Sequence, residues 1–228
     1  MSVVTGGGIA RLKIKVDPGE LLETLGCRNH IDASARVQHR VLKAIDRVTE
    51  LAEPEHVHRF YPVRVENGWA RVNSSVKLRS RRLAHVLESC HTVHLFIVTL
   101  GASMDHMIAA AMRRRPHLGV ILDAAASLAA ESAADELQHS VAEALPDGQE
   151  TTVRFSPGYC DWPLREQQKI FDLFPDRPVG VRLSGDYLMT PRKTVSAVFG
   201  VGPSARLTAL RSPCAACGRA GCPHRRFS

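Results

Sequence analysis

The sequence predicts a single α+β domain, and three features support this prediction. Residues 93–99 form a short, continuous run of β-branched and apolar residues, which is typical of a central strand buried on both faces of a sheet. Residues 122–145 are rich in alanine, the strongest helix former, and indicate a long helix that packs closely against its neighbours. After Gly148, short strand-like and helical segments follow one another. We therefore expect a mixed sheet with packed helices.

The domain is expected to cover residues 11–210, between a short leader at 1–10 and a cysteine-rich tail at 211–228. Residues 11–16 alternate strictly between charged and apolar side chains, which predicts a half-buried strand that ends at an Asp-Pro-Gly turn. Apolar residues then recur at helical spacing over 31–51 and predict a helix. The candidate N-caps of this helix are Asn29 and Asp32.

The remaining elements follow from the same patterns. Glu66-Asn-Gly68 lies between two β-rich segments and predicts a hairpin. Gly101 follows the buried strand and permits a sharp turn into the next helix. The other expected helices cover 79–90, 103–115 and 163–174, and the other expected strands cover 151–155, 179–184 and 194–201.

Composition and charge restrict the class of protein. With 44% apolar residues the chain can build a substantial core, and no apolar run approaches the length of a membrane span. The first residues lack the charged and apolar regions of a signal peptide, so we expect a cytoplasmic protein. The net charge of +7 favours nucleic acid, a phosphate-bearing cofactor or an acidic protein, although a solvated basic surface is the simpler interpretation. Nucleic acid is not favoured, because no helix-turn-helix, RNP or finger spacing accompanies the charge.

The segment Arg154-Phe-Ser-Pro-Gly-Tyr159 is the strongest candidate for a binding site. A strand should stop at Pro157, which cannot donate to a ladder, and Gly158 permits a turn with positive φ or close approach to a ligand. An arginine held there can pair with a carboxylate, and a tyrosine can lie against a flat cofactor. The alternative is a tight turn with an exposed arginine and an anchoring aromatic side chain.

This segment resembles the activation domain of cobalamin-dependent methionine synthase, in which an Arg-x-x-Pro-Gly-Tyr motif binds S-adenosylmethionine and faces the corrinoid. A second segment, Pro191-Arg-Lys-Thr-Val-Ser-Ala-Val-Phe199, is similar to the part of that family in which a Val-Ser pair precedes an aromatic residue near the adenosine. Phe199 stands where that aromatic, usually a tyrosine, is expected. Residues 97–101 and 122–127 resemble small, free-standing relatives of the domain, and the resemblance covers about residues 80–228.

The resemblance implies a methyltransferase-associated reactivation factor. It would bind S-adenosylmethionine and support reductive methylation of cobalamin held by a corrinoid protein or a corrinoid-dependent methyltransferase, with an electron donor as a further partner. Tyr159 would face the corrinoid. An acidic contact to the methyl donor, which the family's N-terminal part supplies, would come here from Glu131, Asp135 or Glu136. The S-adenosylmethionine-binding residues would be Arg154, Ser156, Gly158, Tyr159 and Phe199. The alternative is a non-catalytic binding or assembly module for a corrinoid, a folate or a partner subunit.

The tail contains a cysteine cluster with the spacing of a metal site. Cys214-x2-Cys217-x4-Cys222-x-His224 suits zinc bound by three thiolates and one imidazole. Three thiolates with a fourth ligand elsewhere, for which Cys160 is a candidate, suit an iron–sulfur cluster. The cluster therefore favours a metal site of one of these two kinds over the alternative of three free surface thiols. A chain with such a site could also be a metal- or iron–sulfur-bearing redox accessory protein.

Four other positions have weaker claims to function. His91 and His94 flank the start of the buried strand without a carboxylate in the neighbouring sequence, which favours packing or surface positions. Asp105 fits the start of a helix through the helix dipole, and Asp123 is a cap or a site residue. The sequence contains no P-loop, dinucleotide fingerprint or nucleophile elbow.

Overall fold

The computed structural model describes residues 12–27, 33–174 and 179–207 of the chain. Its helices are α1 (Pro18–Thr24), α2 (Ala35–Leu51), α3 (Arg81–Val86), α4 (Ala102–Arg114), α5 (Pro116–Glu143) and α6 (Gln167–Asp172), with 3-10 turns η1 (Leu164–Glu166) and η2 (Ser204–Arg206). Its strands are β1 (Glu55–Glu66), β2 (Trp69–Val72), β3 (Val76–Leu78), β4 (Thr92–Thr99), β5 (Gln149–Thr151), β6 (Arg182–Leu183), β7 (Met189–Thr190) and β8 (Thr194–Pro203). No helix among these described residues is long and apolar enough to cross a membrane.

The strands form a six-stranded antiparallel sheet in the order β3-β2-β1-β4-β8-β5, and β6 and β7 form a separate two-stranded ribbon. β4 lies between β1 and β8, with Leu95 opposite Arg59 on one side and Val198 on the other. This confirms the prediction of a central strand. The predicted hairpin joins β1 to β2, and Asn67 and Gly68 adopt the two positive φ angles, 54° and 74°, of the turn that suits such a hairpin.

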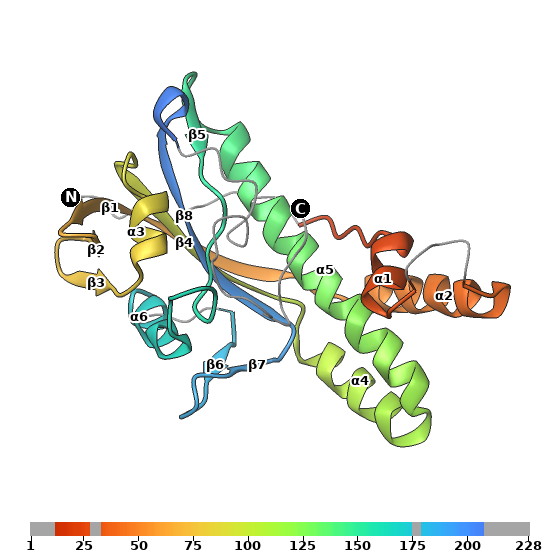
Figure 1. The fold of residues 1–228 in the computed structure, drawn as a ribbon. Helices are drawn as coiled ribbons and strands as arrows, with labels where there is room; N and C mark the ends of the chain where they lie inside the picture. Colours follow the sequence, from red (N-terminus) through yellow and green to blue (C-terminus); the bar gives the residue numbers. More distant parts are fainter. Residues whose placement is uncertain (1–11, 28–32, 175–178, 208–228) are drawn as a thin grey trace.

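Helices cover the two faces of the sheet separately (Figure 1). On one face, the long helix α5 runs diagonally across the sheet, and α1, α2 and α4 pack around it. Phe96, Ala197 and Phe199 point into this core. On the other face, α3 and α6 enclose a second core that contains Ile97 and Val198. The α+β class is confirmed.

α5 confirms the predicted alanine-rich helix but begins at Pro116, which occupies the first helical turn where a missing N–H costs nothing. Six of its alanines are buried, in adjacent pairs four residues apart, against the sheet and neighbouring helices: Ala125, Ala126, Ala129, Ala130, Ala133 and Ala134. Small side chains bring the helix backbone close to the sheet. This close approach positions the polar side chains at the margin of the same helix.

The prediction of a strand over 11–16 is wrong for the described part of that segment. Residues 12–16 have no ladder partner. Leu12, Ile14 and Val16 instead lie against the α5 core, and the backbone N–H of Lys15 donates to Ser132 Oγ at 2.9 Å. Alternating hydrophobicity indicates an extended chain with one buried face. Here that face packs against a helix and not against a neighbouring strand.

Other element boundaries also differ from the expectations, and the predicted 79–90 helix is confined to α3. Ser34 caps α2 by accepting from the N–H of Val37, while the candidate caps Asn29 and Asp32 lie outside the described residues. The predicted 151–155 strand is a short β5 followed by an isolated bridge from Phe155 to Val198, because the chain leaves the ladder before the proline. The predicted 163–174 helix divides into η1 and α6, and 179–184 contributes only the two residues of β6.

Candidate functional site

Residues 154–163 form a compact loop between the sheet and η1. Phe155 exchanges two backbone hydrogen bonds with Val198, at 2.8 and 2.9 Å, which fixes the start of the loop on β8. The backbone N–H of Trp162 donates to the carbonyl of Tyr159, and that of Gly158 donates to the carbonyl of Trp162, both at 2.8 Å. Gly158 has a φ of 96°, a region that favours glycine. The hydrogen bonds fix the backbone of the loop, and Gly158 adopts the positive φ that the sequence predicts.

Trp162 anchors the loop in the second core. Its indole is 1% exposed and lies 6.2 Å from the ring of Phe155, measured between centroids. Tyr159, Cys160 and Ser156 remain half-buried at the loop surface, and Gly158 is exposed. Burial of Trp162 thus presents the Gly158–Cys160 turn outward.

Arg154 points to the opposite side, towards α5. Its guanidinium donates to Glu131 Oε2 at 2.7 Å and to Asp135 Oδ1 at 2.5 Å, from two successive turns of the helix. The arginine side chain is only 13% exposed, whereas that of Asp135 is 70% exposed. Burial alone would lower the pKa of Arg154, but the nearby carboxylates of Asp135 and Glu131 outweigh that effect, so the pKa is raised.

A second cation reaches the same helix. Lys193, on the segment before β8, places its ammonium 2.9 Å from Asp123 Oδ1 and 2.8 Å from Ser127 Oγ. Asp123, Ser127, Glu131 and Asp135 recur every four residues, so they form one polar stripe along α5. This α5 stripe binds one cation from each of the two segments that resemble the family, Arg154 at one end and Lys193 at the other.

Asp161 joins the loop to α3. One carboxylate oxygen accepts the Ser80 hydroxyl at 2.6 Å, and the other accepts the backbone N–H of Arg81 at 2.8 Å. Ser80 itself caps α3 by accepting from Leu83 N–H at 2.9 Å. Sequence analysis missed this role of Asp161. The serine before Arg-Arg-Leu-Ala is a helix-start signal, but its aspartate partner is 81 positions away.

The structure does not bring Phe199 to the surface of this loop. Its ring is 0% exposed and lies under α5, in edge contact with His94 at 4.6 Å between ring centroids. Neighbouring Val198 points to the other face, towards Phe155 and Trp162. Along a strand, successive side chains alternate between faces, so Phe199 and the loop aromatics lie on opposite sides of the sheet.

A histidine cluster lies near Phe199. His58 Nδ1 is 2.7 Å from His94 Nε2, and the ring of Phe60 stacks on His94 at 4.2 Å. Burial first, and then the nearby His58 and His56, lower the pKa of His94 to about 3. His94 is therefore a neutral core residue, as the sequence suggests, and His91 is exposed. The contributions of His56 and His58 were missed, because they come from β1.

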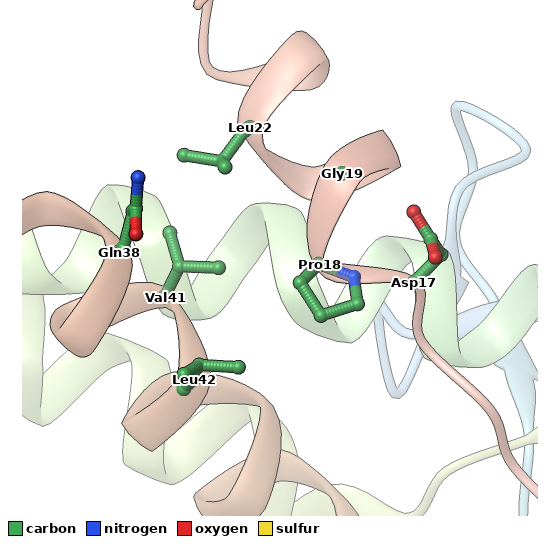
Figure 2. Close-up of a pocket in the computed structure, with 7 residues that line it drawn as sticks. All are labelled: Asp17, Pro18, Gly19, Leu22, Gln38, Val41 and Leu42. Carbon is green, nitrogen blue, oxygen red and sulfur yellow. The ribbon is translucent and has the colours of Figure 1, made fainter. Parts of the chain in front are cut away.

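Two hollows lie away from the loop. One, of about 530 Å³, is lined by Asp105, His106, Ile108, Ala109, Met112, Asp123 and Arg192, and Asp105 Oδ2 accepts the backbone N–H of Arg192 there. The other, of about 380 Å³, lies between α1 and α2, where Pro18 and Leu22 face Val41 and Leu42 (Figure 2). Neither is lined by residues 154–163.

Among the described residues, no group of three or more His, Cys, Asp or Glu side chains is arranged to hold a metal ion. The predicted ligands Cys214, Cys217, Cys222 and His224 lie outside the described residues. The alternative ligand Cys160 is described, half-buried with a φ of 49°. The metal prediction for the tail thus stays a prediction.

The fold and the loop define a class: an antiparallel α+β domain whose arginine-bearing loop is clamped on a long helix. The model of the family described as "Vitamin B12 dependent methionine synthase, activation domain" matches residues 85–211, more than half of the chain, and the chain belongs to this family. The fold is similar to that of the crystal structure of the MetH reactivation domain bound to AdoHcy, with a TM-score of 0.61 and 16% identity over 85% of this chain and 76% of the other. No curated protein matches the sequence.

Proposed function

We propose that this chain binds S-adenosylmethionine through the Arg154–Tyr159 loop and supports reductive methylation of a corrinoid that a partner holds. Membership of the activation-domain family supports the proposal, and the similar reactivation domain was solved with AdoHcy bound. In the reaction, an external donor supplies one electron to the inactive cobalt. The methyl group then passes from the sulfonium to the reduced cobalt and leaves S-adenosylhomocysteine.

The observation that carries the proposal is the cluster of opposite charges at Arg154. An α-amino acid end, such as that of S-adenosylmethionine, carries a carboxylate and an ammonium group. Arg154 can donate to the carboxylate, and Glu131 or Asp135 can accept from the ammonium. The largely exposed Asp135 is the partner that a ligand can displace at the lowest cost.

The loop supplies the rest of the proposed site. Gly158 lets the backbone approach a ligand closely, and Tyr159 next to it is proposed to face the corrin ring. Ser156 lies on the same turn, where its hydroxyl can bond to the ligand. The protein then contributes proximity and orientation, while the two cofactors carry the bond making.

Isothermal titration with S-adenosylmethionine and with S-adenosylhomocysteine tests the binding. Wild-type protein should bind both, and Arg154→Lys should weaken both at least about tenfold because lysine lacks the planar fork. Arg47→Lys is the matched control: it changes an exposed ion pair with Glu50 on α2 and should leave affinity unchanged. Absence of heat and of a thermal shift at millimolar ligand would sink the proposal.

Two observations favour the second candidate, a binding or assembly module without the methyl donor. First, Nη1 and Nη2 of Arg154 already donate to Asp135 and Glu131. Second, the ring of Phe199 is fully buried and offers no exposed face to an adenine. A titration with cobalamin or with a folate that releases heat, together with none from S-adenosylmethionine, would select this candidate.

A further inference from the structure

Four cations gather around the start of α3, and we call them the α3 basic surface: Lys77, Arg79, Arg81 and Arg82. Arg79 and Arg81 are exposed, and the other two are half-buried. None of the four side chains has a carboxylate partner among the described residues.

The acidic side chains near this surface are already engaged. Glu66 pairs with Arg71, and Glu166 pairs with Lys169. Asp161 accepts from Ser80 and from the backbone of α3. The positive charge of the α3 basic surface is therefore not cancelled locally, and in water it is available to an anionic partner.

An aromatic side chain holds part of this surface in place. Lys77 Nζ lies 4.7 Å from the ring centroid of Trp69, and Arg81 Cζ lies 5.6 Å from it. Contact with the ring face restrains two long side chains that would otherwise lose freedom on binding. The surface is thus partly pre-organised.

The α3 basic surface is joined directly to the loop of the proposed site. The backbone N–H groups of Arg79 and Arg81 donate to Glu166 and Asp161, each at 2.8 Å. Lys169 Nζ donates to the carbonyl of Lys77 at 2.7 Å. Figure 1 shows α3 beside the loop that precedes α6, on the face of the sheet away from α5. One partner can therefore contact the loop and the α3 basic surface at the same time.

A protein interface centred on Tyr159 is large enough to include the α3 basic surface. A partner that brings a corrin ring to Tyr159 must cover roughly 800 Å² of this chain, a disc of about 16 Å radius. Asp161 is two residues from Tyr159, no more than about 7 Å along the chain. Since Asp161 contacts the first residues of α3, the α3 basic surface falls inside that disc.

We propose that the α3 basic surface is the docking surface for an acidic patch on the protein or domain that carries the corrinoid. This inference rests on the proposed function. The charge attracts the partner and orients it so that the corrin meets Tyr159, and electrostatic steering of this kind acts mainly on the association rate. α3 is a six-residue helix packed on β2, which suits a protein surface better than a nucleic-acid groove.

The test uses charge reversal with a matched control. Arg79→Glu/Arg81→Glu/Arg82→Glu is compared with Arg113→Glu/Arg114→Glu/Arg115→Glu, which makes the same charge change at the exposed C-terminal end of α4. The probe is a full-length corrinoid protein loaded with cobalamin and immobilised for interferometry. Arg79→Ala/Arg81→Ala/Arg82→Ala serves as a milder second variant, and thermal melts verify that each protein is folded.

At 50 mM salt the α3 variant should associate at least about 30-fold more slowly than wild type, and the control within about threefold. At 500 mM salt the three proteins should converge. Equal weakening of both variants, an unaffected α3 variant, or no binding of wild type would overturn the inference. Tighter patch-dependent binding of a 30-base-pair DNA duplex at 150 mM salt would assign the surface to nucleic acid instead.

Titration with S-adenosylmethionine separates this inference from the proposed function. If the methyl donor binds wild type and the α3 variant equally, and the charge reversal leaves the association rate with the corrinoid protein unchanged, the surface assignment fails and the proposed function stands. If docking depends on the α3 basic surface but no methyl donor binds, the function fails and the surface stands.

Discussion

The guanidinium of Arg154 bridges Glu131 and Asp135, one helical turn apart on α5, at 2.7 and 2.5 Å. The arginine follows β5, so this bridge fixes the edge of the sheet to its longest helix. The same contact stabilises the fold and presents the charges that the proposed ligand needs. Variants at these positions should therefore change stability and binding together.

Replacing Arg154 with alanine should lower the free energy of unfolding by about 1–3 kcal/mol, because the mostly buried Glu131 loses its charged partner and the exposed Asp135 loses a hydrogen bond. Urea denaturation measures this. The double variant Arg154→Ala/Glu131→Ala should lose less than the sum of its single variants, by about 1 kcal/mol. Strict additivity would show that the bridge carries no coupling energy, and Arg47→Ala in an exposed pair should change stability little.

Asp161→Ala should loosen the loop and α3 together. Its carboxylate accepts from Ser80 and the N-terminal N–H groups of α3, so its loss should cost about 1–2 kcal/mol. Hydrogen exchange should rise over residues 80–86 and 156–163 and stay unchanged in α5. Asp172→Ala, which removes an exposed acceptor of Gln168, is the control. Unchanged exchange in α3 would contradict the link.

Stability should fall in acid because of His94. Burial lowers its pKa to about 3 from 6.5, so between these values the unfolded state binds more protons than the folded state. The stabilisation is fully present above pH 6.5 and is lost as the pH falls towards 3, by roughly 4 kcal/mol from this group. His94→Gln cannot take up the proton, so its stability should fall less steeply between pH 6.5 and 4 in urea titrations. Parallel curves for the two proteins would exclude the effect.

Gly200→Ala should destabilise β8 by about 1–3 kcal/mol through overpacking. A Cβ at Gly200 would overlap Cys90 Sγ and come within 2.6 Å of Leu87 Cδ2. Adding Cys90→Ala should recover part of the loss, because it removes the first overlap but keeps the second. Gly185→Ala, which meets nothing within 4 Å, should be close to neutral. A melting temperature for Gly200→Ala equal to that of wild type would refute the prediction.

The cysteine tail predicts bound metal in anaerobically purified protein. Elemental analysis should find about one zinc per chain, or iron with visible absorption if a cluster is present. Cys214→Ser/Cys217→Ser should lose it, and Cys27→Ser is the control. Metal content far below one equivalent in both wild type and control would reject a metal site.

Much of the fold could be predicted because its signals are local. The central strand, the alanine-rich helix and the Asn-Gly hairpin are each specified by a few consecutive residues. The environment of Arg154 could not be derived, since its partners lie 19 and 23 positions away and depend on which side of α5 faces the sheet edge. The burial of Phe199 depends in the same way on the register of β8. Glu131 and Asp135 were named as acidic candidates, but their pairing with Arg154 was not foreseen.

The chain has two tryptophans, and the fold places them in different surroundings. Trp162 is buried against Phe155 and anchors the Arg154–Pro163 loop, so its emission should follow changes in that loop when a small ligand binds. Trp69 lies under Lys77 and Arg81 at the margin of the molecule, where an arriving protein would displace water. Trp69→Phe and Trp162→Phe would therefore yield two single-fluorophore proteins, one sensitive to small molecules and one to assembly. With them, the order in which the proposed methyl donor and the proposed corrinoid carrier bind can be tested by stopped flow without any added dye.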